Sequence, residues 1–190
     1  MQRARRHAPI PEQRRSFIQM VDTDGNRVMA HLVSDFGQFS LVNIGSSNPM
    51  LAIAKNDQIL LKTRWVEAKT LLARKPHLLW VSVDGKLFGV FNLKTMKLAV
   101  PMKWHEYYDV TDGQFLILNT YPSRKDEKHD KRVLISNASG QMICPIFDDL
   151  VETDGGEYLI LKKGDQASVL CCRSRKILEP IRSFATGKVE

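Results

Sequence analysis

Short apolar runs alternate with turn residues along nearly the whole chain. From Phe17 onward the runs are four to seven residues long and rich in Val, Ile, Leu and Phe, as in FSLVNI, LLWVSV, FLILN, RVLIS and YLIL. The segments between them carry turn formers, among them DTDG, GSSN, VDGK, NASG and KKGD. Regular short strands separated by such turns are typical of an antiparallel all-β fold. The pattern therefore predicts an all-β protein.

One segment departs from this pattern. In RWVEAKTLLARK the apolar residues Trp65, Ala68 and Leu72 recur at helical spacing, which predicts a short helix. Pro76 would end that helix, because the residue before a proline is disfavoured in the helical conformation.

The strands recur in a fixed order. The segments LFGVFNLKTMKLAVPMKW, KRVLISNASGQMICPIFDDL and ASVLCCRSRKILEPIRSF each contain a strand, a turn, a second strand and a closing proline. Two earlier copies have Ala30 and Lys62 at the closing position, and successive closing positions lie 32 to 44 residues apart. A further strand (QFSLVN, HLLWVSV, QFLILNT or EYLILKK) precedes each of the last four copies. The predicted unit is three antiparallel strands, a lead strand and then a hairpin, ending at a Pro-x-aromatic corner.

These copies resemble WG repeats, also called KWG repeats. The pattern of that family is roughly Asp-Gly-Lys-aromatic-Gly, two apolar strands and a closing Pro-x-aromatic-Asp. VDGKLFGVFNLKTMKLAVPMKW matches its first part and the closing proline, with Phe88-Gly89 in place of Trp-Gly, and SGQMICPIFDDL matches the glycine and the closing Pro145, Phe147 and Asp148. The family is common in bacteria and is usually regarded as an interaction module without catalytic residues. The resemblance covers about residues 17 to 184, and it implies a binding function.

The motif residues have structural roles. We expect Gly85 and Gly140 to allow the positive φ of tight turns, and the closing prolines to end strands. Trp104 and Phe147 are expected to fill the space between neighbouring units, where repeat arrays bury their core. The structural motif comprises Gly85, Phe88, Gly89, Pro101, Trp104, Gly140, Pro145, Phe147 and Pro180.

The predicted organisation is a flexible basic tail over residues 1–15 and a single WG-repeat-like β domain over residues 16–190. Four to five units could close as a small propeller-like ring or form an open twisted array. Closure removes exposed sheet edges, which favours the ring slightly.

Charge adds a second functional candidate. The chain carries a net charge of +7, of which +4 falls in the first fifteen residues. Arginines on a flexible tail could contact phosphates, so nucleic-acid binding is the alternative function. The polar insertion PSRKDEKHDKR is a second candidate contact site. The candidate contact residues are Arg3, Arg5, Arg6, Arg14, Arg15, Arg124, Lys125 and Lys128.

The remaining features argue against catalysis and export. Asp148 and Asp149 are adjacent and would point to opposite faces of a strand, and His105 has no second ligand at metal-binding spacing. No apolar run reaches the roughly 20 residues that span a bilayer, and no signal-peptide pattern follows the N-terminal charges. Three cysteines, two of them adjacent, fit a reducing compartment. We therefore expect a cytoplasmic protein with no catalytic residue, metal or cofactor.

The sequence thus favours a non-catalytic module that binds another protein. A dedicated inhibitor, such as an immunity protein that blocks a toxin or a defence enzyme, would suit a short protein of this kind. The sequence does not identify the partner.

Overall fold

The computed structural model describes residues 17–45, 48–71, 77–110, 114–120, 132–136, 138–164 and 166–181, apart from the side chains of residues 144–146, 154 and 179–181. Within these residues the protein is almost entirely β, and its one helical segment is the 3-10 turn Asp154–Gly156. The predicted all-β class is confirmed. The Arg3, Arg5, Arg6, Arg14 and Arg15 tail and the candidate residues Arg124, Lys125 and Lys128 lie outside the described residues.

The chain divides into two compact units between Thr63 and Arg64, whereas the sequence predicted a single domain from residue 16. The first unit is a closed barrel of five strands. The strands of this barrel are β1 (Phe17–Val21), β2 (Arg27–Phe36), β3 (Phe39–Ile44), β4 (Met50–Lys55) and β5 (Gln58–Lys62).

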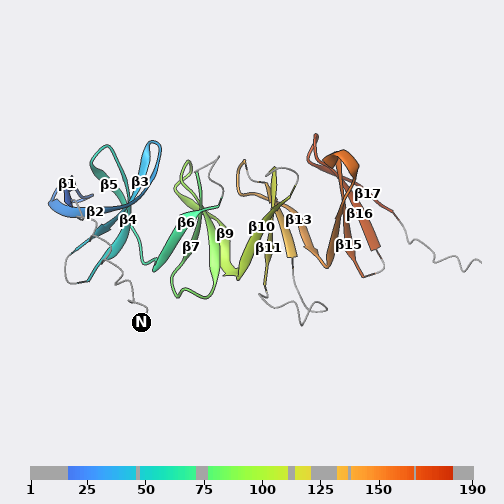
Figure 1. Cartoon of the computed structure of the whole chain (residues 1–190), viewed down its shortest axis with the longest axis horizontal. Coiled ribbons are helices and arrows are strands. Elements are labelled where there is room, and N and C mark those ends of the chain that lie inside the picture. Colours follow the sequence, from blue (N-terminus) through green and yellow to red (C-terminus); the bar gives the residue numbers. More distant parts are fainter. Residues whose placement is uncertain are drawn as a thin grey trace, which may run out of the picture. The chain divides into compact units, whose positions relative to one another are not determined.

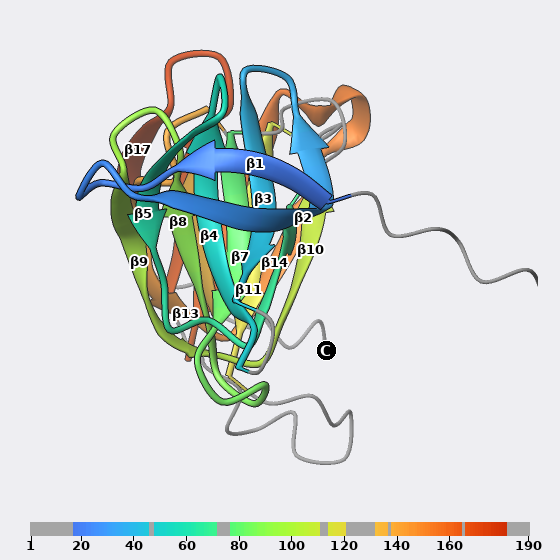
Figure 2. The ribbon, with the colours of Figure 1, turned by 90° about the vertical axis from the view of Figure 1, so that its left-hand side faces the viewer.

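A bend in β2 shapes the barrel. The register of β2 against β3 shifts between Leu32 and Ser34. Residues 27–31 of β2 pair with β1, and residues 30–36 pair with β3. The β1–β2 hairpin therefore lies across β3 and β4 (Figure 2). The core that it covers consists of Met20, Ala30, Val42, Ile44, Ala52, Ala54 and Ile59.

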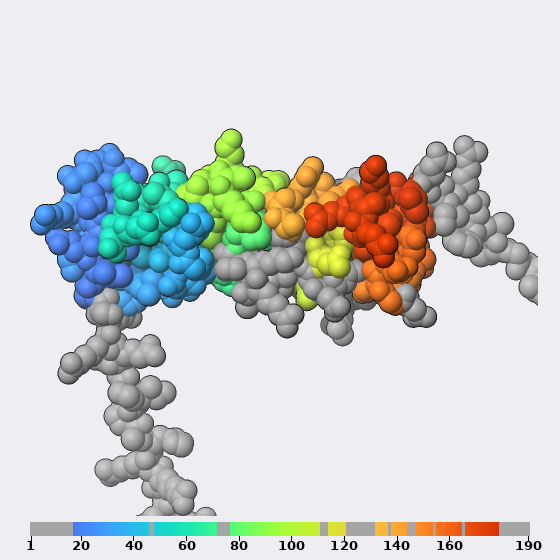
Figure 3. Space-filling view, turned by 90° about the horizontal axis from the view of Figure 1, so that it is seen from above, coloured from blue at the N-terminus to red at the C-terminus, as the bar shows by residue number. Residues whose placement is uncertain are grey.

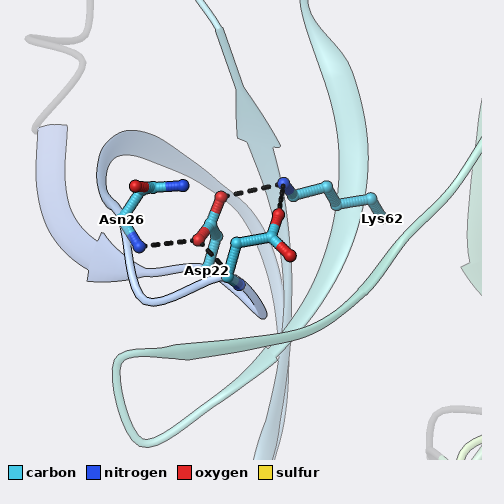
Figure 4. Close-up of polar contacts among 4 residues, drawn as sticks. Asp22, Asn26 and Lys62 are labelled. Carbon is cyan, nitrogen blue, oxygen red and sulfur yellow. Dashed lines mark hydrogen bonds and ion pairs between the residues drawn. The ribbon is translucent and has the colours of Figure 1, made fainter.

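An ion pair lies where the first and last strands of the barrel meet. The Val21 N–H donates to the Asp57 carbonyl at 2.9 Å, and β1 meets β5 at a single parallel register position. Next to this position, the Lys62 ammonium lies 2.8 Å from the buried Asp22 carboxylate (Figure 4). The same carboxylate accepts backbone N–H groups from Asp24 and Asn26. The Lys62 hydrogen bond, followed by the Asn26 N–H, lowers the pKa of Asp22 to about 2.

We expect the Asp22→Asn variant to lower the melting temperature at neutral pH. Because the folded pKa of Asp22 lies below its ordinary value of 3.8, the ionised group stabilises the fold above about pH 4. That contribution is lost as the pH falls toward about 2, so the two proteins should converge in acid. Thermal unfolding followed by circular dichroism at pH 7, 4 and 2 measures this. Asp24→Asn is the matched control, because Asp24 is exposed and lies 3.6 Å from Lys62; an equal loss in both variants would contradict the assignment.

The second unit contains three four-stranded sheets, which Figure 1 shows following one another along the chain. The first sheet has strands β6 (Glu67–Thr70), β7 (Leu78–Ser82), β8 (Phe88–Asn92) and β9 (Lys97–Trp104). The second has β10 (Glu106–Val110), β11 (Phe115–Asn119), β12 (Arg132–Ser136) and β13 (Met142–Phe147). The third has β14 (Asp149–Glu152), β15 (Tyr158–Lys163), β16 (Gln166–Cys171) and β17 (Lys176–Ile181).

Each sheet contains the predicted lead strand and hairpin plus one strand more than predicted. The extra strands β6, β10 and β14 pair with the lead strands β7, β11 and β15. The predicted helix is wrong over Glu67–Thr70, which forms β6, while residues 72–76 lie outside the described residues. Pairing of Ala68 with Val81 provides β6 with backbone partners, and this tertiary interaction overrides the local helical spacing.

The closing prolines also differ from expectation. Pro101, Pro145 and Pro180 were predicted to end strands, but they lie inside β9, β13 and β17. Each of these is the last strand of its sheet, and each has a register shift near its proline. A proline has no N–H group to donate. At an irregular position of an edge strand, the ladder needs no hydrogen bond from that nitrogen.

The three sheets of the second unit stack face to face through two apolar clusters. Alternate residues of β11 point to opposite faces, so Leu116 and Leu118 join the first cluster while Phe115 and Ile117 join the second. The first cluster packs β6–β9 against β10–β13, and the second packs β10–β13 against β14–β17. Seen from above, the sheets succeed one another from green to red (Figure 3).

Candidate interaction surface

The repeat makes residues of successive sheets directly comparable. Trp80, Ile117 and Ile160 occupy the same position of the lead strands β7, β11 and β15. Trp80 is 1% exposed and Ile117 is 2% exposed, because each packs against the sheet that follows. Ile160 is only half-buried. The third sheet therefore presents to solvent the position at which the earlier sheets contact their neighbours.

The neighbouring positions show the same difference in burial between the third sheet and the first two. Val90 and Leu134 of the hairpins are fully buried, whereas Val169 at the same position is half-buried. Leu78 and Phe115 begin their lead strands fully buried, but Tyr158 is exposed.

Together these residues form a continuous apolar surface on β14–β17. Val151, Ile160, Val169 and Leu178 pair in register across the four strands, so their side chains share one face. We call this surface the terminal face and define it by Val151, Tyr158, Ile160, Val169 and Leu178.

Charged residues border the terminal face. The next register row contains Asp149 and Lys162, whose charged groups lie 3.8 Å apart. Asp149 also lies 3.9 Å from the Arg132 guanidinium of β12. On the other side, Lys176 pairs in register with Cys171. An apolar centre with a charged rim is the usual composition of a protein–protein interface.

Four residues of the predicted motif lie in a turn or in the clusters between sheets. Gly85 has a φ of 71° in the β7–β8 turn, where its N–H donates to the Ser82 hydroxyl at 2.9 Å. Phe88 and Trp104 belong to the first apolar cluster, and Phe147 to the second. These residues are therefore scaffold within the second unit.

Gly140 brings the β12–β13 turn against the preceding sheet. Its φ is 75°, and a Cβ there would lie 2.9 Å from the Cβ of Ala99. Two hydrogen bonds fix the same contact, from the Asn92 side-chain amide to the Ser139 carbonyl and between the His77 ring and the Ala138 carbonyl, both at 2.9 Å. The turn thus joins the first two sheets through backbone groups.

The carboxylates considered for catalysis have separate backbone partners. Asp148 accepts the Gly164 N–H at 2.7 Å, and Asp149 accepts the Leu150 N–H at 2.8 Å. Within the described part of the chain, no group of three or more His, Cys, Asp or Glu side chains is placed to hold a metal ion. Nor do these residues include a helix with the length and apolar character needed to cross a bilayer.

Sequence reasoning did not find the terminal face. Its residues have the same apolar character as their buried counterparts, so composition alone cannot separate them. Aligning the copies places Ile160 and Val169 at the positions of Ile117 and Leu134, but it does not indicate which of these positions a neighbouring sheet covers.

Comparison with known proteins assigns no family. No protein-family model matches the chain, and no curated protein matches it. Solved structures with remote similarity include a crystal structure of HIRA(644-1017), with 12% identity and a TM-score of 0.29 over 90% of this chain and 54% of that chain. A eukaryotic initiation factor shows 8% identity and a TM-score of 0.31, covering 87% and 65% of the two chains. The AfRom2 CNH domain shows 9% identity and a TM-score of 0.25, covering 88% of this chain and 54% of that chain.

The chain spans about half the length of the first of these structures. TM-scores this low carry no argument about fold or function. The resemblance to WG repeats stays a prediction.

Proposed function

We propose that this protein is a non-catalytic module that binds another protein through the terminal face. The observation that supports this is that Ile160 and Val169 are only half-buried at positions that are fully buried in both preceding sheets. Leu178 on the same row is 47% exposed. Burying such a row against a partner removes apolar surface from water, which favours association.

The expected partner offers an apolar β-sheet face. In the first two sheets, the sheet that follows covers the equivalent row. The side chains of two packed sheets interdigitate, and the sheets lie about 10 Å apart. The terminal face has the same pleated shape and the same register, so a sheet is the surface that fits it. An inhibitor or immunity protein would act in this way, by covering a surface of its target.

Leu178→Asp should abolish partner binding and leave the fold intact, because it adds a charge to the most exposed residue of the terminal face, on the edge strand β17. Leu98→Asp is the matched control. Leu98 has the same side chain, is 45% exposed and lies on β9, the last strand of the first sheet. A photo-crosslinking residue placed at 178 should capture a protein in cells, and the same residue at 98 should not. Equal capture from both positions, or no capture from 178, would contradict the proposal.

Nucleic-acid binding is tested by removing residues 1–15. If phosphate contacts dominate, DNA and RNA affinity falls steeply and log-linearly with salt and disappears on truncation. If the terminal face dominates, crosslinking from position 178 survives the truncation, because charge on a tail is screened beyond about 8–10 Å at physiological salt. Affinity measured at two salt concentrations for both forms separates the two functions.

A further inference from the structure

The outer face of the β1–β2 hairpin carries exposed apolar side chains. Residues paired across the hairpin point to the same side, and Met20 and Ala30 belong to the barrel core. The alternate residues therefore face outward. They are Phe17, Gln19 and Val21 of β1 and Arg27, Met29 and His31 of β2. Phe17 is 62% exposed and Met29 is 55% exposed, and Figure 2 looks onto this hairpin. We call these six residues the hairpin face.

An open apolar pocket adjoins the hairpin face. Its volume is about 530 Å³, and Met29 of the hairpin face forms part of its wall. Val28 and Ile44 line the same pocket. Lys62 also reaches it, but the Lys62 ammonium is neutralised by the Asp22 carboxylate at 2.8 Å. The pocket therefore suits a hydrocarbon group better than an anion.

Positive charge adjoins the same face. Residues 1–15 carry a net charge of +4, and Arg15 precedes Phe17 by two positions. Two residues of extended chain span about 7 Å at most, so Arg15 joins the hairpin face within that distance in any conformation. Arg27 belongs to the face itself, whose six residues include no carboxylate. The exposed Asp24 of the β1–β2 turn has a lysine ammonium 3.6 Å away, which offsets its charge.

An anionic membrane surface offers partners for both features. Its headgroups carry phosphates and carboxylates, and hydrocarbon lies directly beneath them. Nucleic acid offers phosphates without such an apolar layer, and an apolar protein surface offers no phosphates. An apolar anchor or a basic segment alone binds a membrane weakly, whereas two such signals together hold a protein there.

We propose that the hairpin face docks on membranes that contain anionic lipids. Phe17 and Met29 insert among the acyl chains, while Arg27 and the arginines of residues 1–15 lie among the headgroups. The pocket beside Met29 has room for part of an acyl chain. This site belongs to the first unit, so it does not depend on the function proposed for the terminal face.

Co-sedimentation of the full-length protein with lipid vesicles tests the proposal. We expect binding to vesicles of phosphatidylserine and phosphatidylcholine in equal parts, and binding weaker by about tenfold or more to phosphatidylcholine alone. Affinity for the mixed vesicles should fall as salt rises, because salt screens the charges. Equal affinity for the two kinds of vesicle would overturn the proposal.

The double variant Arg14→Gln, Arg15→Gln tests the contribution of charge. Each arginine near an anionic surface strengthens binding about fivefold, so affinity for the mixed vesicles should fall about 25-fold. The control is Lys94→Gln, Lys97→Gln, which removes the same charge from exposed positions around the β8–β9 turn and should have little effect. Equal losses in the two double variants would show that overall charge, not this face, attracts the membrane.

The double variant Phe17→Ser, Met29→Ser tests the apolar contact without changing the charge. Vesicle affinity should fall about tenfold or more, because two apolar side chains no longer leave water. The melting temperature should stay the same, since both side chains are exposed. Val66→Ser, Val83→Ser is the matched control, at residues of the second unit that are 63% and 49% exposed, and it should bind vesicles as the unsubstituted protein does.

Unchanged vesicle binding by Phe17→Ser, Met29→Ser would overturn the proposal. If that variant and the unsubstituted protein also bound DNA or RNA equally, and more tightly than vesicles, nucleic acid would be the ligand of the arginines.

Phe17→Trp measures insertion directly. Vesicles with brominated acyl chains should quench its fluorescence more than that of the unsubstituted protein, because bromine quenches a tryptophan that enters the hydrocarbon. Equal quenching in the two proteins, with both bound, would mean that charge alone holds the protein at the surface and would refute the insertion of Phe17.

Discussion

Trp80→Ala should destabilise the second unit by about 3–5 kcal/mol, the usual cost of truncating a fully buried tryptophan. Trp80 is 1% exposed and contacts both neighbouring strands and the next sheet. Its ring stacks on Phe88 at a centroid distance of 5.3 Å and meets Tyr107 of β10 edge-on at 5.2 Å. The variant loses apolar burial, both ring contacts and the packing between two sheets.

Urea unfolding followed by circular dichroism measures this loss. Val83→Ala is the control, because Val83 is 49% exposed and its truncation should change stability by no more than about 0.5 kcal/mol. A loss below about 1 kcal/mol for Trp80→Ala would show that the sheets do not depend on this contact.

Gly89→Ala should destabilise the first sheet of the second unit by close to 3 kcal/mol, the upper part of the usual overpacking range. An added Cβ would lie 2.6 Å from the Val100 carbonyl oxygen and 3.0 Å from the Met102 nitrogen. Both are backbone atoms of β9 on either side of Pro101, so they cannot move as a side chain would. The cost comes from this close approach, since Gly89 is not among the residues with positive φ.

Gly85→Ala provides the comparison. Its Cβ would meet only the Val66 side chain at 3.9 Å, but its φ of 71° strains any other residue. We expect a loss of about 1–2 kcal/mol there. Equal losses in the two variants would mean that the bulge around Pro101 relaxes to accept the methyl group.

The apolar pattern predicted most of the local structure. Strand pairs such as β8–β9 and β16–β17 follow from short Val-, Ile- and Leu-rich runs around turns, because period and turn chemistry are local properties. The lead strands β7, β11 and β15 were found in the same way. Gly85 and Gly140 do adopt the positive φ expected from their turns.

The candidate sites were only partly visible in the sequence. The tail arginines stand out in the sequence because charge is a local property, and they lie outside the described residues. Cys171 and Cys172 were seen as a pair in a strand. Their different surroundings follow from the fold, which leaves Cys171 half-buried and places Cys172 in the cluster between the second and third sheets.

The sequence by itself determined that this chain forms repeated β-hairpins with lead strands, since those elements depend on residues close together along the chain. Only the tertiary structure decided the rest. β6 and β14 (EAKT and DLVE) have too few apolar residues to indicate strands, and they exist because β7 and β15 provide hydrogen-bonding partners. Pro101 lies within a strand because an irregular edge ladder does not need its missing N–H. Ile117 and Ile160 are the same residue type at the same repeat position, but packing against the third sheet buries Ile117, while Ile160 stays half-buried.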